Sequence, residues 1–223
     1  VVPVSERQMV CLVADGLGGQ PSGDQASAIT IDLLVSKLEG NVPEPADVMQ
    51  LILSGIEEAN QALVDTSSGS ATTLAIAEIQ DNSIRSYHAG DSMVLMTGQR
   101  GKIKLETISH SPVGYAVEAG LVGEEDSLHH DERHIVSNVI GTPEMHISMG
   151  SSLTMHPRDT LLIASDGLFD NLHKEEIIEI IRKGRLQTCA DRLITTARDR
   201  MQDHIDPWKP DDLSFILFRP ARN

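Results

Sequence analysis

Apolar residues recur with two different periods along the chain, and each period predicts a different kind of element. Short apolar or alternating runs that end in Gly, Asp or Asn are typical of buried strands. The expected strands cover residues 8–14, 72–79, 84–89, 93–97, 103–107, 160–164 and 213–218. Apolar residues spaced three and four apart predict helices instead. The expected helices run from Ser22 to Gly40, from near Pro45 to the Ser/Gly-rich residues 66–70, over 173–182 and over 186–201.

The order of these elements favours a layered fold. Helices come in pairs separated by strands, which is typical of an α+β fold in which a central double sheet is covered by helices on its outer faces. The connectors Asp81-Asn82, Gly90-Asp91 and 98–101 have hairpin length, so we expect an antiparallel meander between residues 72 and 107. Residues 109–157 show no sustained period and are interpreted as an irregular insertion. The absence of repeats and linkers predicts one domain, residues 1–223.

Composition excludes several classes of protein. The 223 residues are 40% hydrophobic, enough for a core, and the longest apolar run, residues 9–14, is too short to cross a membrane. With 18 Lys+Arg against 33 Asp+Glu, the net charge of −15 argues against nucleic-acid binding. Such a surplus mostly serves solubility, although carboxylates also bind Mg²⁺ and Mn²⁺. Cys11 and Cys189 lie in apolar-periodic segments, which predicts buried free thiols and a cytoplasmic location.

An aspartate stands three times at the edge of a strongly apolar strand. These residues are Asp15, Asp166 and Asp211. Strand ends can converge in a protein built around sheets, and converging carboxylates stay ionised only when a cation neutralises them. A donor set of oxygen atoms points to Mg²⁺ or Mn²⁺ rather than zinc. For any single aspartate, the alternative is that an Asp-Gly pair only closes a turn.

Four ordered motifs resemble those of the metal-dependent Ser/Thr protein phosphatases of the 2C type (PPM), in a bacterial-like variant. They are residues 13–19, Gly90-Asp91-Ser92, residues 164–170 and residues 210–214. The resemblance extends from Met9 to Arg219. It implies a four-layer α-β-β-α sandwich with antiparallel central sheets. It also implies a flap at about residues 109–140, beside the active site.

The same resemblance implies the site residues and the chemistry. Asp15 would bridge two divalent metals, Mg²⁺ or Mn²⁺, and the carbonyl of Gly16 would bind one of them. Asp166 and Asp211 would complete the other. The catalytic group would be a water held by the metals, with no protein nucleophile, and the substrate would be phosphoserine or phosphothreonine in a protein. We expect a monomer that binds neither nucleic acid nor a membrane.

Three positions depart from the family pattern. In the family, an Arg and an acidic pair usually precede the first motif. Only 14 residues precede Asp15 in this sequence, and Arg7 lies too close to Asp15 to match that Arg. The N-terminal part of the family domain is therefore expected to be missing here. Leu17 replaces a candidate general acid, which leaves protonation of the leaving group to water. Ser109 replaces a carboxylate of a weaker third metal site, so the other half of that site, Asp170, is expected to bind a third metal weakly or not at all.

Other interpretations stay open at this point. The departures permit a catalytically inactive relative that serves as a binding or regulatory module. A metal-dependent hydrolase of small phosphoesters is a further possibility on the same scaffold. His130 and His134 have a spacing that can bind zinc from one helix face, but the local pattern favours a solvated flap.

Overall fold

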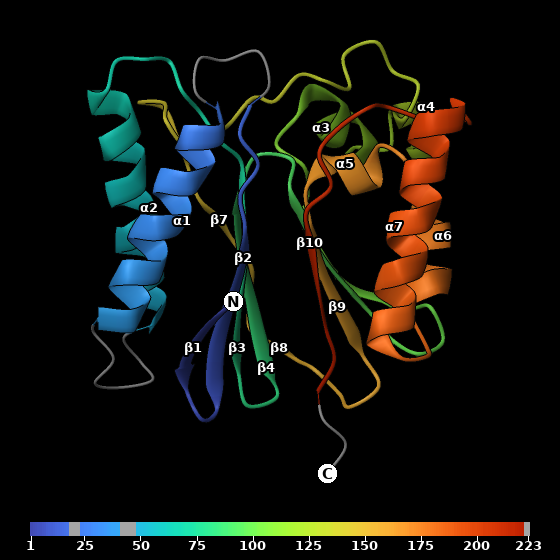
Figure 1. Ribbon diagram of the computed structural model, residues 1–223, viewed down its shortest axis with the longest axis horizontal. Helices are drawn as coiled ribbons and strands as arrows, with labels where there is room; N and C mark the ends of the chain where they lie inside the picture. Colours follow the sequence, from blue (N-terminus) through green and yellow to red (C-terminus); the bar gives the residue numbers. More distant parts are fainter. Residues whose placement is uncertain (18–22, 41–47, 221–223) are drawn as a thin grey trace.

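Two antiparallel sheets lie face to face at the centre of the molecule, and pairs of helices cover their outer faces (Figure 1). This computed structural model describes residues 1–17, 23–40 and 48–220. The layers follow the order helices, first sheet, second sheet, helices, so the predicted α+β sandwich of four layers is confirmed. None of the described helices combines the length and the apolar character that a membrane crossing requires.

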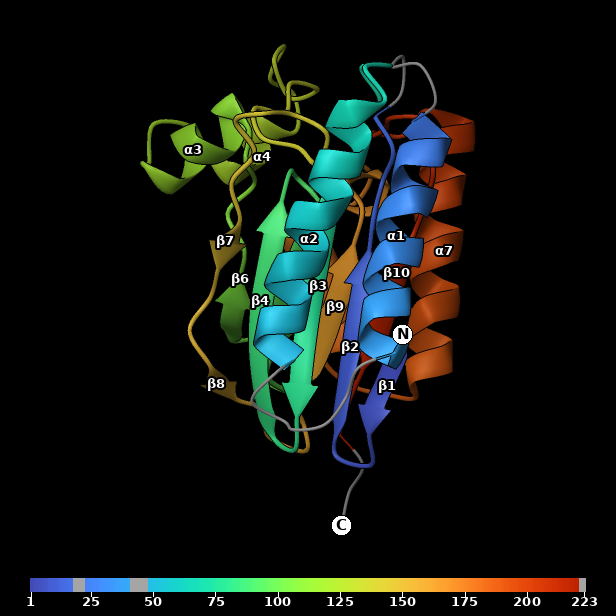
Figure 2. The ribbon, with the colours of Figure 1, turned by 90° about the vertical axis from the view of Figure 1, so that its left-hand side faces the viewer.

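The first sheet is built around two hairpins, β1 (Val2–Ser5) with β2 (Gln8–Val13) and β3 (Leu74–Gln80) with β4 (Ser83–Ala89). The sheet also contains the short β7 (Ser148–Met149) and β8 (Leu153–Thr154), which are both paired to β4. Helices α1 (Gly23–Gly40) and α2 (Val48–Asp65) lie side by side over its outer face (Figure 2). The buried residues of α2 repeat at helical spacing, as the sequence predicts. They are Val48, Ile52, Gly55, Ile56, Ala59 and Leu63.

The second sheet has the strand order β10-β9-β5-β6. Its strands are β5 (Met93–Thr97), β6 (Ile103–Glu106), β9 (Thr160–Ala164) and β10 (Phe215–Phe218). Helices α6 (Lys174–Ile181) and α7 (Leu186–Asp203) cover its outer face, and the four-residue α5 (Asp166–Phe169) follows β9 directly. Cys11 on β2 and Cys189 on α7 are buried free thiols, as predicted.

The continuous apolar run of β9 is explained by burial on both faces. Leu161 and Ile163 pack between the two sheets, whereas Leu162 and Ala164 pack toward α6 and α7. Because successive side chains of a strand point to opposite faces, a strand in the middle of such a sandwich has no polar face. The core therefore has three parts, one between each pair of neighbouring layers.

The predicted meander over residues 72–107 is wrong at one connector. β3 pairs with β4 and β5 pairs with β6, but β4 and β5 belong to different sheets. Gly90-Asp91 therefore carries the chain from one sheet to the other. Gly90 has a φ of 109°, and a Cβ there would lie 2.6 Å from the Cβ of Thr73. The crossing between sheets thus needs a glycine at position 90. The length of the connector alone does not distinguish such a crossing from a hairpin.

The predicted insertion, residues 109–157, contains two short helices, α3 (Pro112–Glu118) and α4 (Glu124–Ser127), and the two-residue strands β7 and β8, and is otherwise irregular. We call residues 109–140 the flap. His130 lies in an irregular segment and His134 in a turn, so the two do not share a helix face. The pattern also missed the strands β1, β7 and β8 and the helix α5. The predicted helix starts at Ser22 and Pro45 lie outside the described residues.

Candidate metal centre

Five aspartates gather where the strands of both sheets end beside the flap. We call Asp15, Asp91, Asp166, Asp170 and Asp211 the carboxylate cluster. Asp15 follows β2, Asp91 lies in the crossing between sheets, Asp166 and Asp170 bound α5, and Asp211 precedes β10. Figure 1 shows these elements meeting at the end of the sandwich that carries α3 and α5. The three strand-edge aspartates of the sequence prediction therefore do converge.

Three members of the cluster are near enough to share one ion. One carboxylate oxygen from each of Asp166, Asp170 and Asp211 lies within 4.8 Å of the others. We call these residues the acidic triad. A donor set made only of carboxylate oxygens suits Mg²⁺ or Mn²⁺, so the residues present fit the implied metals. Asp15 lies beside Asp166, whose carboxylate acts on it both as a charge and as a hydrogen-bonding partner.

The backbone of Asp15 is fixed by the start of β3. The Asp15 carbonyl accepts hydrogen bonds from Thr73 N (2.8 Å) and Thr72 Oγ1 (2.8 Å), and Asp15 N donates to Thr73 Oγ1 (3.3 Å). Thr73 Oγ1 also shares a 2.6 Å hydrogen bond with the buried Ser92 Oγ. Gly16 follows in an isolated bridge with Thr72. These contacts join the first predicted motif to the second and hold the loop of Asp15 at the cluster.

Crowding raises the pKa values of the carboxylates. Burial, followed by the charges of Asp166, Asp211 and Asp91, raises the pKa of Asp15 to about 8. Burial and the charges of Asp166 and Asp170 raise the pKa of Asp91 to about 7. Burial also raises the pKa of Asp170. A divalent cation binds favourably among such carboxylates, because its charge offsets their mutual repulsion and stabilises the ionised form of each ligand.

Lys209 places its ammonium group within the acidic triad. Its Nζ lies 2.8 Å from Asp166 Oδ2, 2.7 Å from Asp170 Oδ2 and 3.0 Å from Asp211 Oδ2. Burial alone lowers the pKa of Lys209, but the charges of Asp170 and Asp166 outweigh it and raise that pKa overall. No pattern in the sequence predicts this role of Lys209. Asp91 was also missed as a member of the cluster, although the motif Gly90-Asp91-Ser92 contained it.

A close backbone contact brings Asp166 and Asp211 together. A Cβ on Gly167 would lie 2.0 Å from the carbonyl oxygen of Asp212. Any larger residue would therefore push α5 away from the segment that carries Asp211. The glycine in the Asp166-Gly167 pair serves this packing rather than a simple turn.

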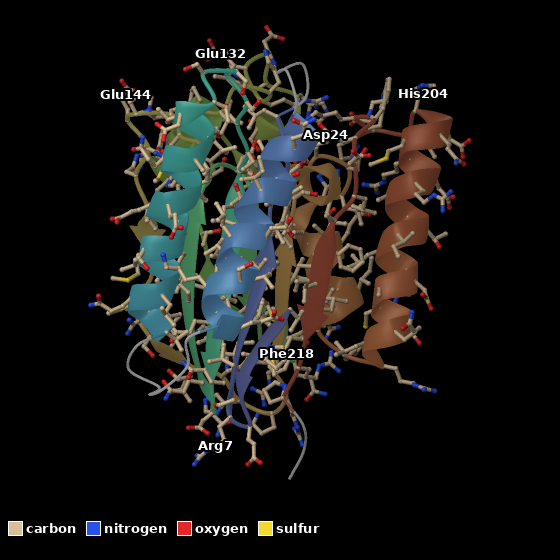
Figure 3. All side chains as sticks on the ribbon, turned by 60° about the vertical axis from the view of Figure 1, so that its left-hand side comes forward. Arg7, Asp24, Glu132, Glu144, His204 and Phe218 are labelled. Carbon is tan, nitrogen blue, oxygen red and sulfur yellow. The ribbon has the colours of Figure 1, made fainter. Side chains whose placement is uncertain are left out.

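A cavity of about 260 Å³ opens beside the cluster, between the flap and helices α5 and α6. Asp91, Asp166 and Asp170 form part of its wall, together with Ser109 and Arg133 of the flap. Both halves of the predicted third metal site, Asp170 and Ser109, therefore face one cavity. Arg7 lies elsewhere, because it pairs with Asp81, and Figure 3 shows it at the opposite end of the molecule from Glu132 of the flap.

Comparison with known proteins assigns the family. The family model described as protein phosphatase 2C matches residues 2–206. The serine/threonine phosphatase Stp of Listeria monocytogenes is 28% identical over 202 residues, which cover 86% of this chain and 79% of that protein. The crystal structure of serine/threonine phosphatase Stp1 from Staphylococcus aureus superposes with a TM-score of 0.83 at 27% identity, covering 96% of this chain and 85% of that one. The catalytic domain of PstP, solved with two manganese ions, shares the fold at 21% identity with a TM-score of 0.75, covering 97% and 92% of the two chains. The chain belongs to the protein phosphatase 2C family.

Proposed function

We propose that this phosphatase removes phosphate from phosphoserine and phosphothreonine in proteins, with two divalent cations, Mg²⁺ or Mn²⁺, held at the carboxylate cluster. The ligands would be Asp15, the carbonyl of Gly16, Asp166 and Asp211, and Asp170 would contribute to a weak third site. The convergence of oxygen donors from both sheets carries this proposal, since the acidic triad lies within 4.8 Å. The family membership supports it independently.

When bound, such cations supply an activated water and stabilise the charge that develops on the transferred phosphoryl group. The residues of the chain hold the proposed ligands in position. Thr72 and Thr73 fix the backbone of Asp15, and the tight contact at Gly167 holds Asp166 near Asp211. The half-buried Leu17 carries no titratable proton, so the proton for the leaving group comes from water.

The cavity explains how a protein substrate reaches the cluster. It lies between the flap and α5, and its wall includes Asp91, Asp166 and Asp170. A phosphorylated side chain that enters it brings its phosphate to the carboxylates while the rest of the substrate stays outside. We therefore propose that residues 1–223 form one catalytic domain whose flap, residues 109–140, borders the substrate entrance.

Asp166→Asn tests the proposal. Phosphate release from a phosphopeptide should require added Mn²⁺ or Mg²⁺, should stop with EDTA, and should fall by roughly two orders of magnitude or more in this variant because one anionic ligand is lost. Asp212→Asn is the matched control, since Asp212 is exposed and is not a proposed ligand. Full activity in Asp166→Asn would overturn the proposal.

Two further measurements separate the alternatives. Calorimetric titration with Mn²⁺ should show binding, whereas an inactive phosphatase-like module would bind the metal weakly or not at all. Comparison of a phosphopeptide with a sugar phosphate distinguishes a protein phosphatase from a hydrolase of small phosphoesters. A preference for the sugar phosphate would contradict the proposed substrate class.

A further inference from the structure

Lys209 makes more ionic contacts than any other lysine among the described residues. Its Nζ forms ion pairs with all three carboxylates of the acidic triad, at N–O distances of 2.7 to 3.0 Å. Lys174 contacts two carboxylates, while Lys37 and Lys104 contact one each. An ammonium group surrounded by three carboxylates is itself a bound cation, and it lies among the same oxygen atoms that a divalent ion would need.

The position of Lys209 is built into the fold. Asn171 is fully buried, and its side-chain amide donates to the carbonyl oxygens of Gly167 (2.8 Å) and Lys209 (2.9 Å). Lys209 N donates in turn to Asn171 Oδ1 (2.8 Å). One buried amide thus fixes the backbone of Lys209 on both sides and ties it to α5. The main chain of Lys209 is therefore held beside the triad, whereas the position of a surface lysine is usually not fixed in this way.

We propose that Lys209 is an internal counter-ion that competes with a divalent cation for Asp166, Asp170 and Asp211. This inference rests on the proposed function, because it assumes that metals bind at the cluster. A divalent ion at the triad takes the lone pairs that Lys209 occupies, and two cations at such short range repel each other. Metal loading must therefore displace the ammonium group, which lowers the affinity for the metal at the triad.

The arrangement has two consequences. In the metal-free chain the ammonium group partly neutralises the carboxylates, which lowers the repulsion among them. The metal at the triad then binds more weakly than the metal held by Asp15 and Gly16, and its occupancy follows the free metal concentration. Lys209 thereby sets the concentration of metal at which the second site fills.

Mn²⁺ titration of Lys209→Met by calorimetry tests this inference. The variant removes the charge but keeps a side chain of similar length. The weaker of the Mn²⁺ sites should tighten by about tenfold or more, which corresponds to ~1.4 kcal/mol. Lys209→Arg keeps the charge and should stay within about threefold of the wild type. Lys104→Met is the control for loss of a partly buried lysine, since Lys104 pairs with Asp159 alone, and it should leave both Mn²⁺ affinities unchanged.

Thermal unfolding provides a second readout. In EDTA, Lys209→Met should melt below the wild type because the triad loses its counter-ion. In excess Mn²⁺ its melting temperature should rise by more than that of the wild type, since ligand binding stabilises in proportion to affinity. Lys104→Met should instead lower the melting temperature equally with and without Mn²⁺.

The outcomes are distinguishable. Equal Mn²⁺ affinities in the wild type and Lys209→Met, or weaker binding by the variant, would overturn the role of Lys209 and leave the proposed function intact. No Mn²⁺ binding by either protein would overturn both. Tighter binding by Lys209→Arg, to the same degree as by Lys209→Met, would also contradict competition by charge.

Discussion

Acidification should destabilise this phosphatase through His110, a buried imidazole at the base of the flap. His110 Nδ1 lies 3.1 Å from Gly90 N and 2.8 Å from Asn138 Nδ2, and both of these atoms are donors. Nδ1 must therefore accept, which places the ring proton on Nε2, 2.9 Å from Ser148 Oγ. Protonation of Nδ1 would break both accepted hydrogen bonds. It would thus loosen the contact between the flap and the crossing that carries Asp91.

The size of the effect follows from the pKa difference between the folded and unfolded chain. Burial, with the neighbouring rings of His88 and His146, lowers the pKa of His110 to about 4. The unfolded value is about 6.5, so the unfolded chain gains a proton first as the pH falls. The contribution of the neutral His110 ring to the free energy of unfolding is complete above about pH 6.5 and is lost as the pH falls toward 4. Linkage gives a loss of about 2 kcal/mol between pH 7 and pH 5. The pKa of His88 is also lowered by burial, which adds a loss of the same sign.

Urea unfolding of the wild type and of His110→Asn, in EDTA at about pH 7 and pH 5, measures this loss. The Asn side chain keeps an acceptor near the position of Nδ1 but does not titrate. The carboxylate cluster titrates in both proteins, so the difference between their pH dependences isolates His110. The wild type should lose about 2 kcal/mol more than the variant. Equal losses would refute the assignment of Nδ1 as an obligatory acceptor.

Two substitutions test the supports of the cluster. Asn171→Leu leaves the Gly167 carbonyl and both backbone groups of Lys209 without their side-chain partner. The free energy of unfolding, measured with urea, should therefore fall by about 2–4 kcal/mol. A fall below about 1 kcal/mol would contradict this role. Gly167→Ala forces α5 away from Asp212, where a Cβ would lie 2.0 Å from the carbonyl oxygen. Mn²⁺ affinity should therefore fall at least about tenfold, and an unchanged calorimetric titration would show that the contact does not position Asp166.

Hydrophobic periodicity predicts the elements whose burial is regular. The apolar run at 160–164 coincides with β9, and the stripe that includes Ile52 and Ile56 coincides with the buried face of α2. The change of sheet at Gly90-Asp91 was not predictable because a short connector has the same length in a hairpin and in a crossing. Helix α5 has four residues, too few to establish a period, and the four-residue β1 contains Pro3, a residue type that argues against a strand.

The candidate site shows the same division between local pattern and three-dimensional proximity. Motifs single out Asp15, Asp166 and Asp211 because each ends or precedes a strand at a recognisable spacing. Lys209 and Asp91 take part through their positions in space, which depend on the Asn171 amide and on the crossing between sheets. A lysine two residues before an aspartate carries no pattern of its own, so only the structure identifies it.

The charge of the cluster connects Lys209 with the expected weakness of a third metal site. Bound metals restore the ionised form of the aspartates, and the displaced ammonium group of Lys209 stays near the cluster because Asn171 holds its backbone. Five ionised aspartates and this lysine then give −5 + 1 = −4, which two divalent cations neutralise with 2 × 2 = 4. A third divalent ion would leave an excess of two positive charges in a partly buried site. Ser109, which faces the same cavity as Asp170, supplies no carboxylate to offset it. Lys209 and Ser109 therefore both lower the affinity for a third metal. Lys209 adds one positive charge beside Asp170, and Ser109 lacks the negative charge that a carboxylate at its position would add.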